Sequence, residues 1–208
     1  AGLLAGMHAR GGAELRTGVG VVALEGDGRV ERVVLADGST LPADLVVVGT
    51  GAVPATGWLE GSGLTLDDGV VCDPCLQAAP GVWAAGDVAR FPDALGGTRR
   101  LEHWTSAAEQ GVLAAKNALS PDAQTPYAPV PFVWSEWYGL PLQIVGACTG
   151  EDVRVVGDVE GGRWVALYRD DDLLVGAVTV GLPGRTGKLR KRIVAGGSFD
   201  EAVAYAES

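Results

Sequence analysis

Hydrophobic and polar positions predict a short helix followed by several short strands at the start of the chain. Leu3, Leu4 and Met7 recur at helical spacing, and the helix is expected to stop at Gly11 and Gly12. Strands are then predicted over residues 13–17, 19–25 and 29–36, with a glycine hairpin turn over residues 26–28. These elements indicate a small, turn-rich sheet.

Residues 44–48, Asp-Leu-Val-Val-Val, are continuously apolar after the first position, which is typical of a strand buried on both faces. The glycines at Gly49 and Gly51 and the proline at Pro54 follow directly, without a convincing long helix after them. This favours a close backbone approach between domains or to a cofactor ring over a phosphate-binding loop. Gly18-Val19-Gly20 runs into a strand, whereas a pyrophosphate loop needs a helix N-terminus, so we reject it as a dinucleotide motif.

A second apolar run, residues 82–85, breaks into Gly86 and Asp87. We interpret it as a buried strand whose end allows close approach of another group, because glycine has no Cβ. An acid at such a position needs strong hydrogen bonds, which a polyol hydroxyl or a helix N-terminus would supply. Spacing alone leaves an exposed turn aspartate equally open.

A long helix is predicted over residues 107–119, with Ser106 and Glu109 as a capping box and Ser120-Pro121 as its end. Its alanine-rich sequence indicates close packing against a neighbour. The positive N-terminus is a natural seat for an anion or an electron-rich ring edge, although an ordinary capped helix has the same pattern.

The last third of the chain predicts an antiparallel sheet and closing helices. A proline-rich linker over residues 125–131 precedes an aromatic stretch, in which alternation places Trp134 and Trp137 on opposite faces. An antiparallel meander is predicted over residues 140–147, 152–159, 163–168 and 173–180, and a closing helix over 199–206. Between them lies a basic cluster on a helix, read either as a solvated face or as a docking patch for an acidic protein: Arg185, Lys188, Arg190, Lys191 and Arg192.

Composition narrows the class of protein. With 208 residues and 47% hydrophobic residues, the chain is expected to be globular, and its net charge of −10 argues against nucleic acid as a main partner. No apolar run reaches membrane-spanning length and no leader is recognisable, so we expect a cytoplasmic location. Cys72-x-x-Cys75 could be a thiol redox pair or half a metal site, but no helix follows it, which favours a structural role. No metal site is expected, and the oligomeric state stays open.

Three short motifs occur in one order: Gly86-Asp87, then Leu101-Glu102-His103-Trp104, then Trp134-Ser135-Glu136. With them the sequence resembles the C-terminal half of FAD- and pyridine-nucleotide-dependent ferredoxin reductases of the putidaredoxin-reductase-like type. The resemblance implies an α/β fold that becomes α+β in its C-terminal part. It implies the rear of an NAD(P)-binding domain over residues 1–50, the returning part of an FAD-binding domain over 51–124, and a small antiparallel-sheet-plus-helix reductase C-terminal domain over 127–208.

The resemblance also implies cofactor-binding roles, with no residue assigned to catalysis. Asp87 would accept hydrogen bonds from the ribitol chain of FAD, and Gly86 would allow its approach. Glu102, His103 and Trp104 would lie near the flavin and nicotinamide rings. Gly49, Gly51 and Pro54 match the strand-end motif at the nucleotide site. Trp134 would lie near the flavin, on the side where the iron–sulfur protein docks. The implied reaction passes a hydride from NAD(P)H to FAD and then single electrons to a ferredoxin-type [2Fe-2S] protein.

The sequence departs from this family at several places. Both glycine fingerprints for the pyrophosphates would lie before residue 1, Glu136-Trp137 stands where Asp-Gln is expected, and Pro54-Ala55 replaces Pro-Asn. We therefore expect weak FAD and NAD binding by this chain alone, since most of the cofactor-binding surface is missing. The alternative is a truncated, flavin-free interaction module that binds a protein partner through the basic cluster.

Overall fold

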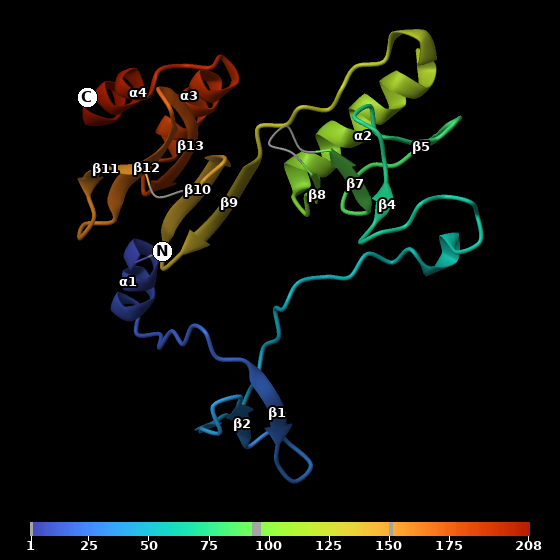
Figure 1. Cartoon of the computed structure of the whole chain (residues 1–208). Helices are drawn as coiled ribbons and strands as arrows, with labels where there is room; N and C mark the ends of the chain where they lie inside the picture. Colours follow the sequence, from blue (N-terminus) through green and yellow to red (C-terminus); the bar gives the residue numbers. More distant parts are fainter. Residues whose placement is uncertain (1, 93–96, 150–151) are drawn as a thin grey trace. The chain divides into compact units, whose positions relative to one another are not determined.

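The computed structural model describes residues 2–92, 97–149 and 152–208 (Figure 1). The chain divides into two compact units, Ala1–Ala52 and Val53–Ser208, and each is described by itself. Among the described residues, no helix has the length and apolar character needed to cross a membrane.

The first unit contains a helix and a small antiparallel sheet. Helix α1 (Gly2–Arg10) ends at the predicted glycine pair, and the sheet follows in the order β1 (Val21–Glu25), β2 (Arg32–Leu35), β3 (Thr40–Pro42). Strands β1 and β2 form the predicted hairpin, in which Glu25 pairs with Arg32. A Cβ at Gly26 would lie 1.9 Å from the carbonyl oxygen of Arg29, so this hairpin requires glycine.

Two strand predictions in the first unit are wrong. Residues 13–17 form no strand, and residues 44–48 are neither a strand nor buried, with Leu45 81% and Val47 86% exposed. A strand buried on both faces needs neighbours that supply hydrogen bonds and cover its side chains. The described part of the chain places no strand beside residues 44–48.

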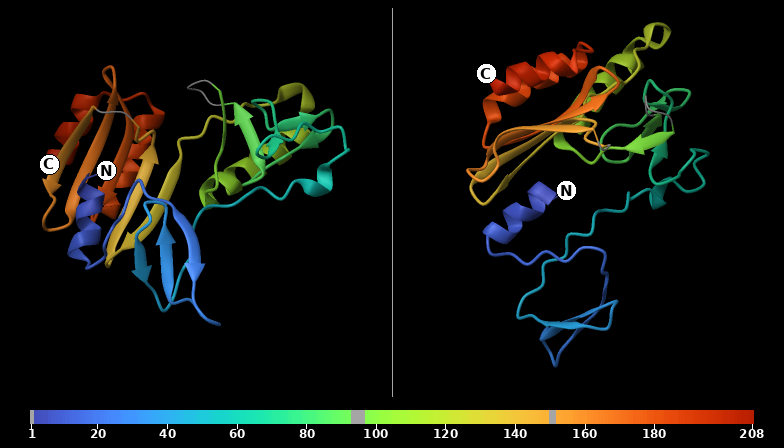
Figure 2. Two further views of the ribbon diagram at one scale, coloured as in Figure 1. Left: turned by 60° about the horizontal axis from the view of Figure 1, so that its bottom comes forward. Right: turned by 60° about the vertical axis from the view of Figure 1, so that its left-hand side comes forward.

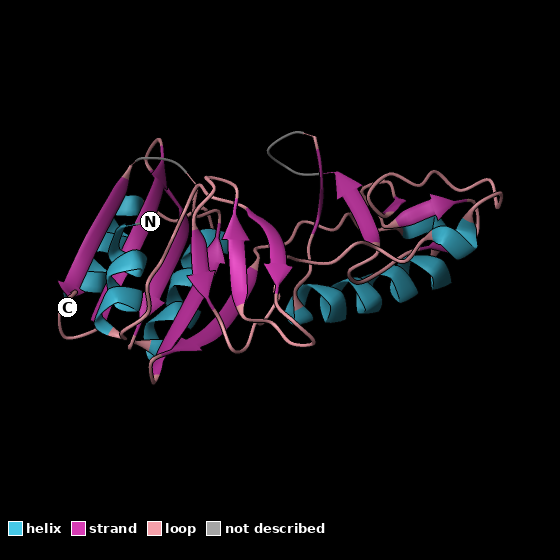
Figure 3. Cartoon of the chain, turned by 90° about the horizontal axis from the view of Figure 1, so that it is seen from below, coloured by secondary structure: helices cyan, strands magenta, loops and turns pink. Residues whose placement is uncertain are grey.

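The second unit begins with short strands and one long helix (Figure 3). Its strands and short helical turns are η1 (Gly57–Leu59), β4 (Val70–Val71), β5 (Gln77–Ala79), β6 (Val82–Trp83), β7 (Ala89–Pro92) and β8 (Thr98–Arg100). Strand β7 pairs in parallel with β4 and antiparallel with β8, while β5 and β6 form a two-stranded ribbon. Helix α2 (Trp104–Leu119) and the turn η2 (Pro121–Ala123) follow.

The predicted capping box at the start of α2 is wrong. The helix begins at Trp104 with His103 as its N-cap, and no side-chain hydrogen bond caps it. Ser106 lies inside the helix, where it is 3% exposed and its Oγ is 2.9 Å from Tyr127 Oη. A tertiary contact has therefore replaced the local capping interaction.

The rest of the second unit is a five-stranded antiparallel sheet with two helices on one face (Figure 2). The elements are β9 (Phe132–Trp137), β10 (Leu140–Gly146), β11 (Val153–Asp158), β12 (Arg163–Asp170), β13 (Leu173–Val180), α3 (Pro183–Val194) and α4 (Phe199–Glu207). The strand order is β11-β12-β13-β10-β9. The predicted strands and helices are present, but the simple meander is wrong, because β10 pairs with β13 and not with β11.

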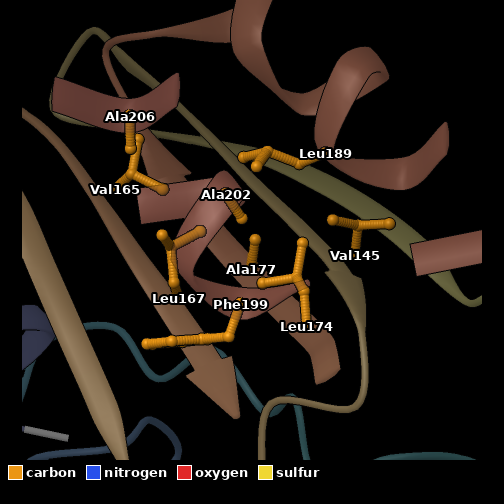
Figure 4. Packing of buried hydrophobic residues seen from close by; sticks show 9 residues of the cluster. All are labelled: Val145, Val165, Leu167, Leu174, Ala177, Leu189, Phe199, Ala202 and Ala206. Carbon is orange, nitrogen blue, oxygen red and sulfur yellow. The ribbon is translucent and has the colours of Figure 1, made fainter. Parts of the chain in front are cut away.

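The main core lies between this sheet and the helices (Figure 4). From the strands, Val145, Leu167 and Ala177 are fully buried, and from the helices, Leu189 and Ala202 are fully buried. Burying a large aliphatic side chain of this kind stabilises the fold by about 1.5–3 kcal/mol. This region therefore encloses an apolar core of its own.

Candidate functional site

The Gly-Asp turn, formed by Gly86 and Asp87, connects β6 to β7. Gly86 has a φ of +80°, a left-handed conformation that favours glycine. A Cβ at this position would lie 3.7 Å from the Cβ of Ala107, so the turn packs against the first turns of α2. The predicted buried strand before it is shorter than expected: β6 covers only Val82 and Trp83, and Val82 is 41% exposed because it belongs to a two-stranded ribbon.

A chain of buried polar groups holds the nitrogen side of this turn. The backbone N–H of Gly86 donates to Gln110 Oε1 at 2.8 Å, and Gln110 Nε2 donates to Ser106 Oγ at 3.1 Å. The Ser106 hydroxyl in turn meets the Tyr127 hydroxyl at 2.9 Å. Burial raises the pKa of Tyr127, which keeps its phenol protonated and able to donate.

Arg100 holds the carbonyl side of the same turn. Its Nη1 donates to the backbone oxygen of Asp87 at 2.9 Å and also binds Glu102, while Nη2 lies 3.3 Å from Asp68 Oδ1. The Asp87 side chain is exposed, and the described residues provide no hydrogen-bond partner for its carboxylate. The backbone of the turn is thus fixed, and the carboxylate is available.

The start of α2 lies beside this turn. Because no side chain caps the helix, its first N–H groups keep their donor capacity and the partial positive charge of the helix end. Trp104 is 83% exposed, and the buried Nδ1 of His103 has no hydrogen-bond partner within the described ranges. Glu102, in contrast, is already paired with Arg100.

Trp134 lies on edge strand β9, half exposed, with its ring stacked on Phe132 at a centroid distance of 5.7 Å. Beside it is a hollow of about 440 Å³, lined by Trp134, Ser135, Glu136, Pro141 and Gln143. Thr105 Oγ1 donates to the Phe132 carbonyl at 2.9 Å, which links the first turn of α2 to the start of β9. One hydrogen bond thus joins the residue that follows the second sequence motif to a residue two positions before the third.

The glycines at Gly49 and Gly51 belong to the first unit, and Pro54 belongs to the second. All three lie outside regular secondary structure. Their role at a nucleotide site stays a prediction.

The cysteines do not have the properties of a redox pair. Cys72, Cys75 and Cys148 are free thiols, and Cys72 is buried with its Sγ 3.4 Å from the Val70 carbonyl oxygen. Burial raises the pKa of Cys72 to about 11 and also raises that of Cys75, whereas reactive thiols need a lowered pKa. Within the described ranges, no cluster of metal-binding side chains is found.

The basic cluster on α3 is largely occupied by contacts within the chain. Arg185 donates to the carbonyl oxygens of Tyr205 and Ala206 at 2.7 and 2.9 Å, and Arg190 pairs with Glu109 at 2.8 Å. Lys188 lies 5.4 Å from the centre of the Tyr205 ring. These contacts reduce the charge available to an acidic partner.

Sequence reasoning missed Gln110 and Arg100, the residues that hold the Gly-Asp turn. A signal for Gln110 was present, because Ser106, Gln110 and Asn117 place polar side chains on one face of an otherwise alanine-rich helix. Polar groups on a buried helix face must find partners. No comparable pattern identified Arg100.

Comparison with known proteins finds two family profiles that match this chain. The family profile described as pyridine nucleotide-disulphide oxidoreductase matches residues 2–111, and the one described as reductase C-terminal matches residues 132–208. The biphenyl dioxygenase system ferredoxin–NAD(+) reductase component of Paraburkholderia xenovorans is 37% identical over 157 residues, which cover 74% of this chain and 38% of that protein. Human apoptosis-inducing factor 3 is 35% identical over 176 residues, which cover 82% of this chain and 29% of that protein.

The crystal structure of the covalent putidaredoxin reductase–putidaredoxin complex contains a similar chain, with a TM-score of 0.82 and 27% identity. The match covers 100% of this chain and 55% of that one. This chain therefore spans less than half the length of the two curated relatives and about half of the solved one. The predicted fold class is confirmed as a partial oxidoreductase domain of mixed sheets followed by an antiparallel five-stranded sheet with helices. The chain belongs to the pyridine nucleotide-disulphide oxidoreductase family, within which it is similar to ferredoxin reductases, and it has a reductase C-terminal domain over residues 132–208.

Proposed function

We propose that this chain contributes one half of an FAD site and works as part of an NAD(P)H:ferredoxin reductase. The observation that carries the proposal is the Gly-Asp turn, whose backbone is fixed while the Asp87 carboxylate is exposed beside an uncapped helix N-terminus. A carboxylate without a partner suits a polyol, because its oxygens accept hydrogen bonds from hydroxyl groups.

The residues present fit a flavin in chemical terms. Asp87 would hold ribitol hydroxyls, and Gly86 offers no side chain to obstruct them. The first N–H groups of α2, with His103 and Trp104 at the helix start, would face the electron-rich edge of the ring. Glu102 would act through its ion pair with Arg100. When bound, FAD supplies the hydride and single-electron chemistry of the reaction.

The remaining assignments extend the same proposal. Gly49, Gly51 and Pro54 would lie at the NAD(P)H site. Trp134 would lie near the flavin, on the side where a ferredoxin-type [2Fe-2S] protein docks. The division into residues 1–50, 51–124 and 127–208 is proposed on the same grounds. The relatives support the reaction type, because one is named a ferredoxin–NAD(+) reductase component and a solved relative is bound to putidaredoxin.

A chimera tests the proposal. Residues 1–208 replace the matching part of the biphenyl dioxygenase reductase component, so that the amino-terminal part of that protein supplies the rest of the fold. We expect a purified chimera with flavin absorbance that oxidises NADH in the presence of a [2Fe-2S] ferredoxin. The unmodified relative is the matched control. A folded chimera that carries no flavin and oxidises no NADH would contradict the proposal.

A further inference from the structure

We infer that Gln110 and Arg100 are positioning residues that together fix the Gly-Asp turn, Gln110 through the Gly86 N–H and Arg100 through the Asp87 carbonyl. The inference deepens the flavin role proposed above and rests on it for its functional meaning. In structural terms, Gln110 on α2 and Arg100 on β8 set the orientation of Asp87, although neither residue belongs to the turn.

The Gln110 amide can adopt only one orientation in this network. The residue is 0% exposed, so both ends of its amide must be satisfied inside the protein. The Gly86 nitrogen can only donate, so it requires the oxygen of the amide, and the NH₂ group is then left to face Ser106 Oγ. Ser106 and Tyr127 complete the chain of bonds, which fixes the rotamer of Gln110.

Arg100 is held in the same way by its partners. Its side chain is only 10% exposed, and it binds two carboxylates, those of Asp68 and Glu102, in addition to the Asp87 carbonyl. The hydrogen bond with Glu102 contributes most to raising the pKa of Arg100, so the guanidinium stays charged. A Cβ at Gly69 would lie 3.0 Å from Arg100 Cδ, which shows how closely this side chain is packed.

In this turn the backbone groups make the structural contacts, and the Asp87 side chain makes none of them. The N–H of Gly86 is bound to a helix and the C=O of Asp87 to a strand, so both anchors are rigid elements. The carboxylate of Asp87 takes no part in either contact. A preorganised turn of this kind holds a ligand-binding side chain without using it for folding.

Amide hydrogen exchange of the 208-residue chain, followed by NMR, tests the inference. In Gln110→Met the side-chain volume is kept and both hydrogen bonds are lost, so we expect the Gly86 amide to exchange roughly tenfold faster. The amide of Leu167, in the core of the five-stranded sheet, should keep its rate.

Two further variants complete the design. Gln124→Met, on the loop after α2, is the matched control and should leave Gly86 unchanged. Arg100→Lys keeps the charge but loses the forked geometry of the guanidinium, and it should speed exchange at Ala89, whose N–H closes the turn onto the Gly86 carbonyl at 3.0 Å.

An unchanged Gly86 exchange rate in Gln110→Met would overturn the inference, because it would show that the lost hydrogen bond does not protect this amide. An equal increase at Leu167 would also overturn it, because it would report global destabilisation. An unchanged Ala89 rate in Arg100→Lys would overturn the role assigned to Arg100. The measurement needs no flavin. A chimera that never binds FAD would therefore overturn the proposed function, while the exchange rates still decide the role of Gln110 and Arg100.

Discussion

The five-stranded sheet and residues 44–48 both contain short apolar runs, but the side chains of these runs reach opposite states of burial. Val165 and Leu167 on β12 are 1% and 0% exposed, whereas Val47 is 86% exposed. The difference lies in the neighbours. Strand β12 lies between β11 and β13 and is covered by helix side chains, while the described chain pairs nothing with residues 44–48. An apolar run therefore forms a buried strand only where other segments supply backbone hydrogen bonds and cover its side chains.

The largest expected effect tests this contrast directly. Leu167→Ala removes buried methyl groups from a closed core and should lower the free energy of unfolding by about 2–5 kcal/mol. Val47→Ala, at an exposed position, should change it by less than about 0.5 kcal/mol. Urea denaturation followed by far-UV circular dichroism, which reports on both units, measures both. Similar losses of unfolding free energy in the two variants would contradict the difference in burial between the two regions.

The predictability of the fold follows the same division. Helix α1, the β1–β2 hairpin and the C-terminal elements follow from local periodicity and turn residues. Pairing of β10 with β13 could not be predicted, because strand order depends on contacts distant in sequence. In the site, local patterns identified Gly86 and Asp87. They missed Gln110 and Arg100, whose bonds to the turn span 24 and 13 residues.

A second prediction concerns pH and the small core around β4. Burial raises the pKa of Cys72 from 9.0 to about 11, so between these values the folded chain binds more protons than the unfolded chain. The free energy of unfolding should therefore fall as pH rises through this window, by an amount on the order of 2 kcal/mol. Urea denaturation across the window should show a shallower fall in Cys72→Ala. The same fall in that variant would assign the effect to other groups, such as Cys148, whose pKa burial also raises.

A third prediction concerns the contact of α3 with the sheet. The hydroxyls of Thr179 and Thr186 are 2.7 Å apart, and both residues are nearly fully buried. Thr179→Val leaves the Thr186 hydroxyl without its partner and should cost about 1–2 kcal/mol of unfolding free energy, while Thr179→Val with Thr186→Val should recover much of that loss. A double variant as unstable as the sum of the two single variants would show that the hydroxyls do not interact.

The smallest expected effect is at the link between α2 and α3. Arg190 and Glu109 are 2.8 Å apart, with side chains 35% and 41% exposed, so water screens the pair. Glu109→Gln should lower the free energy of unfolding by less than about 1 kcal/mol, and added salt should reduce the difference further. Thermal denaturation at low and high salt measures it. A loss of unfolding free energy as large as that of Leu167→Ala would mean that this ion pair stabilises the fold as much as a core side chain does.

The central claim is that the Asp87 carboxylate holds part of a flavin, and FAD titration of the chimera tests it most directly. Asp87→Ala removes the carboxylate without touching the backbone contacts of the turn, and Asp122→Ala, on η2, is the matched control. We predict that Asp87→Ala raises the dissociation constant of FAD at least roughly tenfold, while Asp122→Ala leaves it unchanged. An Asp87→Ala chimera that binds FAD as tightly as the unsubstituted chimera would contradict the account.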